Sequence, residues 1–209
     1  MRYAVPVICL LSFAVLAAAM LAGLTAPADL AIRESIHRLA SDNLTTLSVY
    51  LSFVGSSPVW LAAAVLIAAG LWLAGRRKQA SALAACLLGA IVLENVLKLV
   101  LHRARPDVFF GTLPATYSFP SGHALFAMCF YGALAIIATD SNLSIQKRAF
   151  VWFIAILLVL GIGLSRIYLG VHYPSDVLAG YLAGAAWIAC LHAAGVFDSG
   201  ADGRKGAAR

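Results

Sequence analysis

The chain has 209 residues, of which 62% are hydrophobic and only 11% are charged. Soluble domains carry about 25% charged residues, so the composition excludes an ordinary water-soluble protein and favours one integral membrane domain, which we place at residues 1–197. The net charge of +6 does not indicate nucleic acid as a partner, because the basic residues lie between apolar runs and form no stripe on a polar face.

The apolar runs predict an all-α, polytopic membrane protein with six transmembrane helices, since each run is long enough to cross about 30 Å of hydrocarbon. The first run is longer than the hydrophobic region of a typical signal peptide, so we favour a retained span; the alternative is cleavage near Ala26–Ala28. The predicted spans cover residues 3–24, 51–74, 80–101, 122–139, 149–165 and 176–195.

Two segments fall outside these spans. Residues 28–43 carry a partial helical stripe of apolar side chains, which predicts a short helix in the membrane interface. Residues 198–209 are rich in Gly, Ala and charge, and we expect a disordered tail there. The cysteines lie inside apolar runs without metal-type spacing, so we interpret them as buried apolar residues. They are Cys9, Cys86, Cys129 and Cys190.

The distribution of basic residues predicts the orientation of the chain in the membrane. With the N-terminus in the cytoplasm, the cytoplasmic segments hold nine Lys and Arg residues and the opposite side holds six. Both termini are then cytoplasmic, and orientation does not explain Lys98, Arg105 and Arg166 on the opposite side. The nine are Arg2, Arg76, Arg77, Lys78, Lys147, Arg148, Arg204, Lys205 and Arg209; the six are Arg33, Arg38, Lys98, Arg103, Arg105 and Arg166.

The third predicted span ends in two cations on one helical face. Lys98 and Arg105 are seven residues apart, which is nearly two helical turns, and Pro106 then favours the end of the helix. Because like charges repel, this pair indicates an anion-binding site, although snorkelling at the interface is an alternative. We interpret the neighbouring His102 and Arg103 as snorkelling side chains.

The segment "FPSGHALFAM" opens the fourth predicted span. Ser121 precedes the apolar run and is a natural N-cap, and Gly122 allows a close approach of the backbone to a ligand. The free N–H groups of the first turn favour an anion, and His123 would project beside it. The alternative is an ordinary helix cap with an incidental histidine.

The segment Ser165–Asp176 supplies a third set of polar residues. Asp176 follows His172 by four residues and can orient one imidazole nitrogen, which leaves the other as a nucleophile. Arg166 offers a fork of donors suited to phosphate oxygens. Although an ordinary cap with a nearby histidine is the alternative here, all three segments fall on one side of the membrane. Together they indicate phosphoryl transfer.

The three segments read Lys98-x6-Arg105-Pro106, Pro120-Ser121-Gly122-His123 and Ser165-Arg166-x5-His172-x3-Asp176. This pattern resembles the three-part signature of the type 2 phosphatidic acid phosphatase family, which shares its core with vanadium haloperoxidases. The resemblance implies that His172 forms a phosphohistidine, that Asp176 orients it and that His123 protonates the leaving oxygen. It implies no metal and no cofactor. The implied phosphate-binding residues are Lys98, Arg105, Ser121, Gly122 and Arg166, and the candidate supporting residues are Glu94, Pro106, Pro120 and Ser165.

The resemblance implies a lipid phosphatase of the bacterial inner membrane, with a lipid phosphate as substrate and its site on the outer face. The expected substrates are undecaprenyl diphosphate, phosphatidate or phosphatidylglycerophosphate, and a lipid A phosphatase or phosphotransferase is an alternative. A vanadate-dependent haloperoxidase is disfavoured because the site lies among spans suited to lipids. A non-enzymatic transporter is disfavoured because binding alone needs no oriented nucleophile. The oligomeric state stays open.

Overall fold

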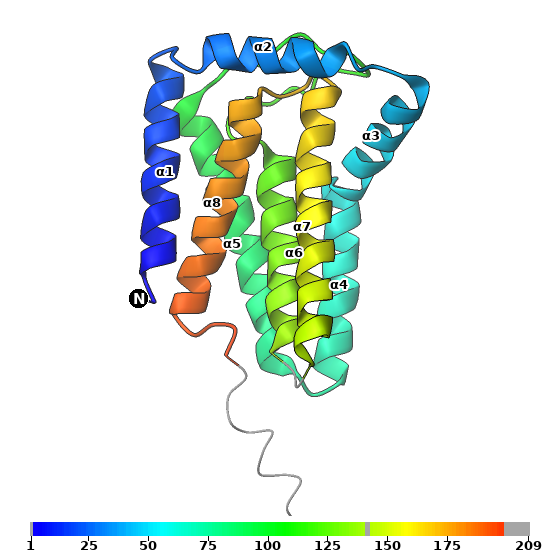
Figure 1. Ribbon diagram of the computed structural model, residues 1–209. Coiled ribbons are helices and arrows are strands. Elements are labelled where there is room, and N and C mark those ends of the chain that lie inside the picture. Colours follow the sequence, from blue (N-terminus) through cyan, green and yellow to red (C-terminus); the bar gives the residue numbers. More distant parts are fainter. Residues whose placement is uncertain (1, 141–142, 199–209) are drawn as a thin grey trace, which may run out of the picture.

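The computed structural model describes residues 2–140 and 143–198, and this part of the chain is built from helices (Figure 1). Helices α1 and α4 to α8 run side by side as a bundle, while α2 lies across one end of it. The expected all-α architecture is confirmed. The helices are α1 (Ala4–Leu21), α2 (Ala26–His37), α3 (Asp42–Val54), α4 (Ser57–Leu73), α5 (Arg77–Leu101), α6 (Gly122–Thr139), α7 (Ile145–Tyr168) and α8 (Pro174–Ala193).

Five of the described helices are long and apolar enough to cross a membrane, and α3 with α4 makes a sixth span if the bent pair is counted as one. The second span therefore differs from the continuous helix expected at 51–74. It starts at Asp42 and bends by 48° between α3 and α4. Pro58 stands in the first turn of α4, where a proline favours a new helix start. The interfacial helix is shorter than expected and ends at His37.

The core of the bundle is the contact between α6 and α8. Two glycines of α8 allow it: a Cβ at Gly180 would lie 2.6 Å from the carbonyl oxygen of Ser121, and one at Gly184 would lie 2.9 Å from Cβ of Met128. Small residues at this spacing let two membrane helices approach closely. The N-termini of the two helices meet as a result, and the N–H of Ser121 donates to the carbonyl of Asp176 at 2.9 Å.

The two ends of the bundle differ in their charges. The end opposite α2 carries the N-terminus and the turns that precede α5 and α7 (Figure 1), with the basic residues Arg2, Arg76, Arg77, Lys78, Lys147 and Arg148. The α2 end holds the connections 102–121 and 169–173. The tail expected to be disordered lies, from residue 199 onward, outside the described residues.

Candidate active site

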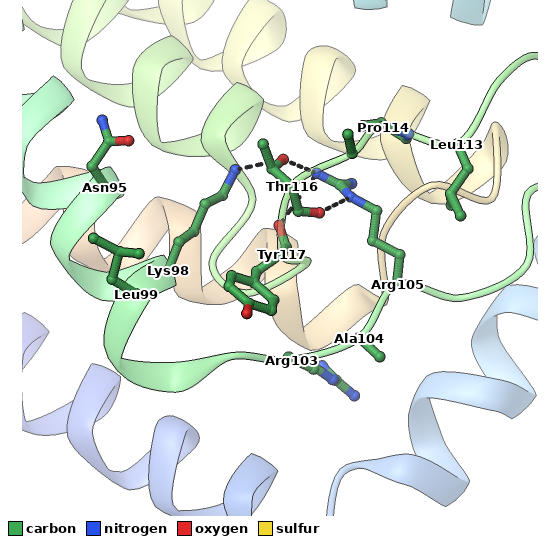
Figure 2. A pocket seen from close by; sticks show the side chains of 11 residues that line it. Asn95, Lys98, Leu99, Arg103, Ala104, Arg105, Leu113, Pro114, Thr116 and Tyr117 are labelled. Carbon is green, nitrogen blue, oxygen red and sulfur yellow. Dashed lines mark hydrogen bonds between the residues drawn. The ribbon is translucent and has the colours of Figure 1, made fainter.

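The residues singled out from the sequence converge at the α2 end, where α5 ends and α6 and α8 begin. Lys98 lies in the last turn of α5, and Arg105 lies in the connection that follows. A cavity of about 630 Å³ borders both side chains and residues 113–117. Figure 2 shows Lys98 and Arg105 reaching Thr116 from two sides, whereas Arg103 turns away from it. Two of the predicted cations therefore line one cavity.

His172 lies between α7 and α8, and both nitrogens of its ring are engaged. Nδ1 is 3.3 Å from Oδ2 of Asp176, and Nε2 is 3.1 Å from a guanidinium nitrogen of Arg105. A guanidinium can only donate, so Nε2 accepts and the proton of the neutral ring resides on Nδ1. Burial lowers the pKa of His172 to about 4, against the opposing effect of Asp176. The ring is therefore neutral at pH 7, with its lone pair on Nε2.

Asp176 is fully buried in the first turn of α8, and four donors hold its carboxylate. Oδ2 accepts from the N–H of Tyr173 at 2.8 Å, from the hydroxyl of Ser118 and from Nδ1 of His172. Oδ1 accepts from Arg103 at 2.7 Å. An acid at this position reaches back to the N–H of the cap residue, which closes the first turn. The carboxylate is thus fixed in one orientation toward His172.

Arg105 presents its guanidinium to the lone pair of His172 because backbone carbonyls hold it there. It donates to the carbonyl of Thr116 at 2.7 Å, to the hydroxyl of the same residue at 3.0 Å, and to the carbonyl of Val171 at 2.8 Å. Burial lowers the pKa of Arg105 from its usual value, and the nearby carboxylates oppose this shift. An arginine remains charged under these conditions. A fixed cation therefore lies against the lone pair of Nε2.

Glu94 brings a carboxylate to the same corner. Its Oε1 is 2.6 Å from Nζ of Lys98, one turn further along α5. The carboxylate also lies against the N-terminus of α6, since a Cβ at Gly122 would be 2.5 Å from Oε1. The side chain of Glu94 therefore explains why position 122 holds a glycine. A carboxylate between a lysine and a helix N-terminus shows that this corner attracts negative charge.

Two buried polar atoms of this corner lack a hydrogen-bond partner within residues 2–140 and 143–198. Ser121 is at the N-cap of α6, as expected, yet its fully buried hydroxyl does not make the expected capping bond. Arg166, in the last turn of α7, donates to the hydroxyl of Ser52, while its Nε has no partner. Unpaired buried groups are costly, and they are typical of sites where a ligand supplies the missing bond.

The other predicted residues lie around this corner. The ring of His123 is close to Gly55, at the break between α3 and α4, since a Cβ at Gly55 would be 3.3 Å from its Cδ2. Ser165 is buried and donates within α7, to the carbonyl three residues earlier, at 2.6 Å. Pro106 and Pro120 are buried in the connection between α5 and α6.

Sequence reasoning missed several residues of this site. Arg103 does not snorkel: its side chain is only 13% exposed and bridges Asp176 and Asp29. The available signal was its place in the sequence, because Arg103 lies between Lys98 and Arg105, two cations already assigned to the site. Ser118 and Thr116 gave no signal, because hydroxyl residues are common in any loop.

No group of three or more His, Cys, Asp or Glu side chains within the described residues is arranged to hold a metal ion. Cys86 and Cys129 are buried, and Cys9 and Cys190 are half-buried; all four are free thiols. Metal-independent catalysis stays a prediction.

Comparisons with known proteins agree on one family. A family profile described as the PAP2 superfamily matches residues 79–197. The chain is similar to phosphatidylglycerophosphatase B of Bacillus subtilis, with 32% identity over 182 residues, covering 86% of this chain and 89% of the relative. It is similar to undecaprenyl-diphosphatase of Sulfolobus acidocaldarius, with 34% identity over 154 residues, covering 71% and 68%. The crystal structure of a transmembrane PAP2-type phosphatidylglycerolphosphate phosphatase from Bacillus subtilis matches with a TM-score of 0.84 and 28% identity, over 99% of this chain and 100% of that one.

Proposed function

We propose that this chain, which belongs to the PAP2 superfamily and is a membrane phosphatase of that type, hydrolyses a lipid phosphate through a phosphohistidine on His172. The observation that carries this proposal is the pairing of the imidazole. Its Nδ1 faces Asp176 at 3.3 Å, while the lone pair of Nε2 faces Arg105 at 3.1 Å. An imidazole oriented by a carboxylate, with a cation beside its free nitrogen, suits attack on an anionic phosphoryl group.

In the proposed first step, Nε2 of His172 attacks phosphorus, an N–P bond forms, and the bond from phosphorus to the leaving oxygen breaks. His123 donates a proton to that oxygen, so the lipid alcohol, or the lipid monophosphate from a diphosphate, departs. Arg105 must first transfer its hydrogen bond from Nε2 to a phosphoryl oxygen. In the second step water attacks phosphorus, His123 takes its proton, the N–P bond breaks, and orthophosphate is released.

The phosphoryl oxygens would be bound by the cations Lys98, Arg105 and Arg166. The hydroxyl of Ser121 and the backbone at Gly122 would add neutral donors from the N-terminus of α6. The phosphate would then replace the Glu94 carboxylate as the partner of Lys98. Donors already aimed at the developing charge are the main source of rate acceleration in such reactions.

Four residues would support this machinery without forming the new bonds. Glu94 pairs with Lys98, and Ser165 bonds within the helical turn that precedes Arg166. The buried Pro106 and Pro120 would fix the two ends of the connection between α5 and α6.

The proposed substrates follow from the names of the relatives, which are a phosphatidylglycerophosphatase and an undecaprenyl-diphosphatase. We propose phosphatidylglycerophosphate, phosphatidate or undecaprenyl diphosphate, with a lipid A phosphatase or phosphotransferase as the alternative. We also propose a location in the bacterial inner membrane, with the α2 end outside and both termini cytoplasmic. The basic residues at the opposite end of the bundle support this orientation.

The test is phosphate release by the purified protein in detergent, from the four lipids in parallel and in the presence of a chelator. We expect turnover without divalent metal, competitive inhibition by vanadate, and a phosphorylated form absent from His172→Ala. Loss of activity in chelator with recovery on adding Mg²⁺ or Zn²⁺ would overturn the mechanism. Halide oxidation that requires vanadate would favour the haloperoxidase, and lipid movement without phosphate release would favour the transporter.

A further inference from the structure

We propose that Asp29 and Arg103 are positioning residues of the reaction, through which the interfacial helix α2 fixes the orientation of Asp176. This inference rests on the proposed function, because it requires Asp176 to orient the nucleophile His172. It gives α2 a role in catalysis beyond its location across the end of the bundle.

Arg103 connects the two carboxylates directly. One guanidinium nitrogen donates to Oδ1 of Asp176 at 2.7 Å, and the other donates to Oδ2 of Asp29 at 2.7 Å. The first nitrogen also donates to the hydroxyl of Ser175 at 2.7 Å, and the ring of Tyr173 lies 4.0 Å from Cζ. Short charged bonds in two directions, with an aromatic ring on one face, leave the guanidinium one orientation.

Asp29 secures the start of α8 from another helix. Its Oδ1 accepts from the N–H of Ser175 at 2.9 Å and its Oδ2 accepts from the hydroxyl of the same residue at 2.6 Å. The first N–H groups of a helix have no partner within the helix, so Asp29 acts as a cap supplied by α2. The side chain of Asp29 is 3% exposed, which protects these bonds from competition by water. The residue immediately after this capped position is Asp176.

The bond between His172 and Asp176 depends on these neighbours. Its length of 3.3 Å is beyond the 2.7–3.2 Å of a strong N–H···O bond, so it does not by itself hold the carboxylate. Arg103 holds Oδ1, and Ser118 and the N–H of Tyr173 hold Oδ2. Without Arg103 the carboxylate loses its donor on Oδ1, and only the bonds to Oδ2 would then oppose its rotation relative to the imidazole.

The experiment compares Arg103→Lys and Asp29→Asn with a matched control, Arg33→Gln. Arg33 is also a buried residue of α2, but it donates to the backbone carbonyls of Asp107 at 2.6 Å and Gly170 at 3.3 Å. It therefore anchors α2 without touching either member of the pair. Lys at 103 keeps the charge but cannot reach both carboxylates, and Asn at 29 keeps the shape of the side chain.

We expect Arg103→Lys to lower kcat about 100-fold and Asp29→Asn about 10-fold, with KM and the vanadate inhibition constant changed less than about threefold. Arg33→Gln should lower the melting temperature comparably but change kcat less than about threefold. In the double variant Asp29→Asn/Arg103→Lys, the fold-reduction in kcat should not exceed the product of the two single fold-reductions, because both residues act through the carboxylate of Asp176.

If the two variants lose no more kcat than Arg33→Gln at an equal loss of melting temperature, the network is structural and the inference is wrong. The same result follows if KM rises while kcat holds. His172→Ala separates this failure from that of the proposed function. Full activity of His172→Ala would overturn the proposed reaction itself, whereas an inactive His172→Ala with unaffected Arg103 and Asp29 variants would overturn the positioning role alone.

Discussion

The candidate site has two halves that meet their hydrogen-bonding needs in opposite ways. In the half around His172 and Asp176, protein groups supply the hydrogen bonds to the Asp176 carboxylate. One of these groups is the guanidinium of Arg103, which also bonds to Asp29 of α2. In the half around Ser121 and Arg166, two buried atoms lack a hydrogen-bond partner among the described residues. The ammonium group of Lys98 in this half forms an ion pair with Glu94 of the same helix. The first half already has its partners within the protein, and in the proposed reaction the anionic substrate supplies those of the second half.

The difference has an energetic meaning. A paired, buried network needs no rearrangement at the moment of reaction, which is where preorganised sites gain their rate. An unpaired buried donor costs about 1–3 kcal/mol of folding stability, and a bound phosphate returns that cost as affinity. The contrast predicts that damage to the first half lowers turnover, whereas damage to the second half lowers turnover and phosphate affinity together.

The largest effect is expected for His172→Ala. Removing the proposed nucleophile should lower kcat by about 10⁴-fold or more, because oriented binding alone leaves little catalysis. Phosphate release measures the rate, and an unchanged melting temperature in detergent shows that the fold is retained. Residual turnover within tenfold of the unmodified chain would contradict the role of this ring.

Arg105→Lys should have the next largest effect, because Arg105 belongs to both halves. Lysine keeps the charge but loses the fork that reaches His172 and the carbonyl of Thr116 together. We expect kcat/KM to fall about 10²- to 10³-fold, with a weaker vanadate inhibition constant. An unchanged inhibition constant would show that the guanidinium does not bind the phosphoryl oxygens.

Ser121→Ala tests the incomplete half with a smaller change. The variant removes a buried hydroxyl without a partner in the described residues, so the melting temperature should hold or rise. We expect kcat/KM to fall about 10-fold, since the hydroxyl would bond only to the phosphate. The matched control is Thr139→Ala at the opposite end of α6, whose hydroxyl bonds to the carbonyl of Ala135 at 2.7 Å. That control should keep full activity.

The smallest perturbation is a change of pH, which tests whether His172 in the first half is shielded from water. Burial lowers the pKa of His172 to about 4, so its ring should stay neutral at pH 5. Between pH 6.5 and 4 the unfolded chain binds a proton at this residue and the folded chain does not, so this histidine destabilises the fold as the pH falls. Nitrogen-15 spectra of the histidine rings, assigned with His172→Ala, measure the titration; a midpoint near 6.5 would contradict a closed site.

Much of the fold could be predicted because the signals are local. A run of apolar residues of membrane-spanning length needs no partner to be recognised, and the span expected at 122–139 coincides with α6. The bend in the second span does not follow from the apolar pattern, although the sequence has two helix-disfavouring residues, Gly55 and Pro58, at that point. Apolar residues flank the segment Gly55-Ser-Ser-Pro58 on both sides, which favours one span, whereas the bend is set by packing, since a Cβ at Gly55 would be 2.5 Å from the side chain of Ile162.

The same limit applies to the site. The spacing of four residues between His172 and Asp176 predicted their contact, because both belong to one short segment. Arg103 is 73 residues from Asp176 and 74 residues from Asp29, and nothing in the composition of those segments links them. Such contacts depend on how α2 crosses the bundle, which is a property of the whole fold. Sequence spacing therefore predicted the contact between the proposed reacting groups better than their contacts with the residues around them.

The network of Asp29, Arg103 and Asp176 also has a consequence for biogenesis. Its members come from α2, from the connection after α5 and from α8, the last of the described helices, so the ion pair of Arg103 with Asp176 requires α8 to be in place. In the folded chain the side chains of Arg103, Asp29 and Asp176 are only 13%, 3% and 0% exposed, so all three charged groups are withdrawn from water together. If Arg103 positions Asp176 as proposed, activity requires the last described helix to be inserted and packed, so an assay of turnover also measures completed assembly.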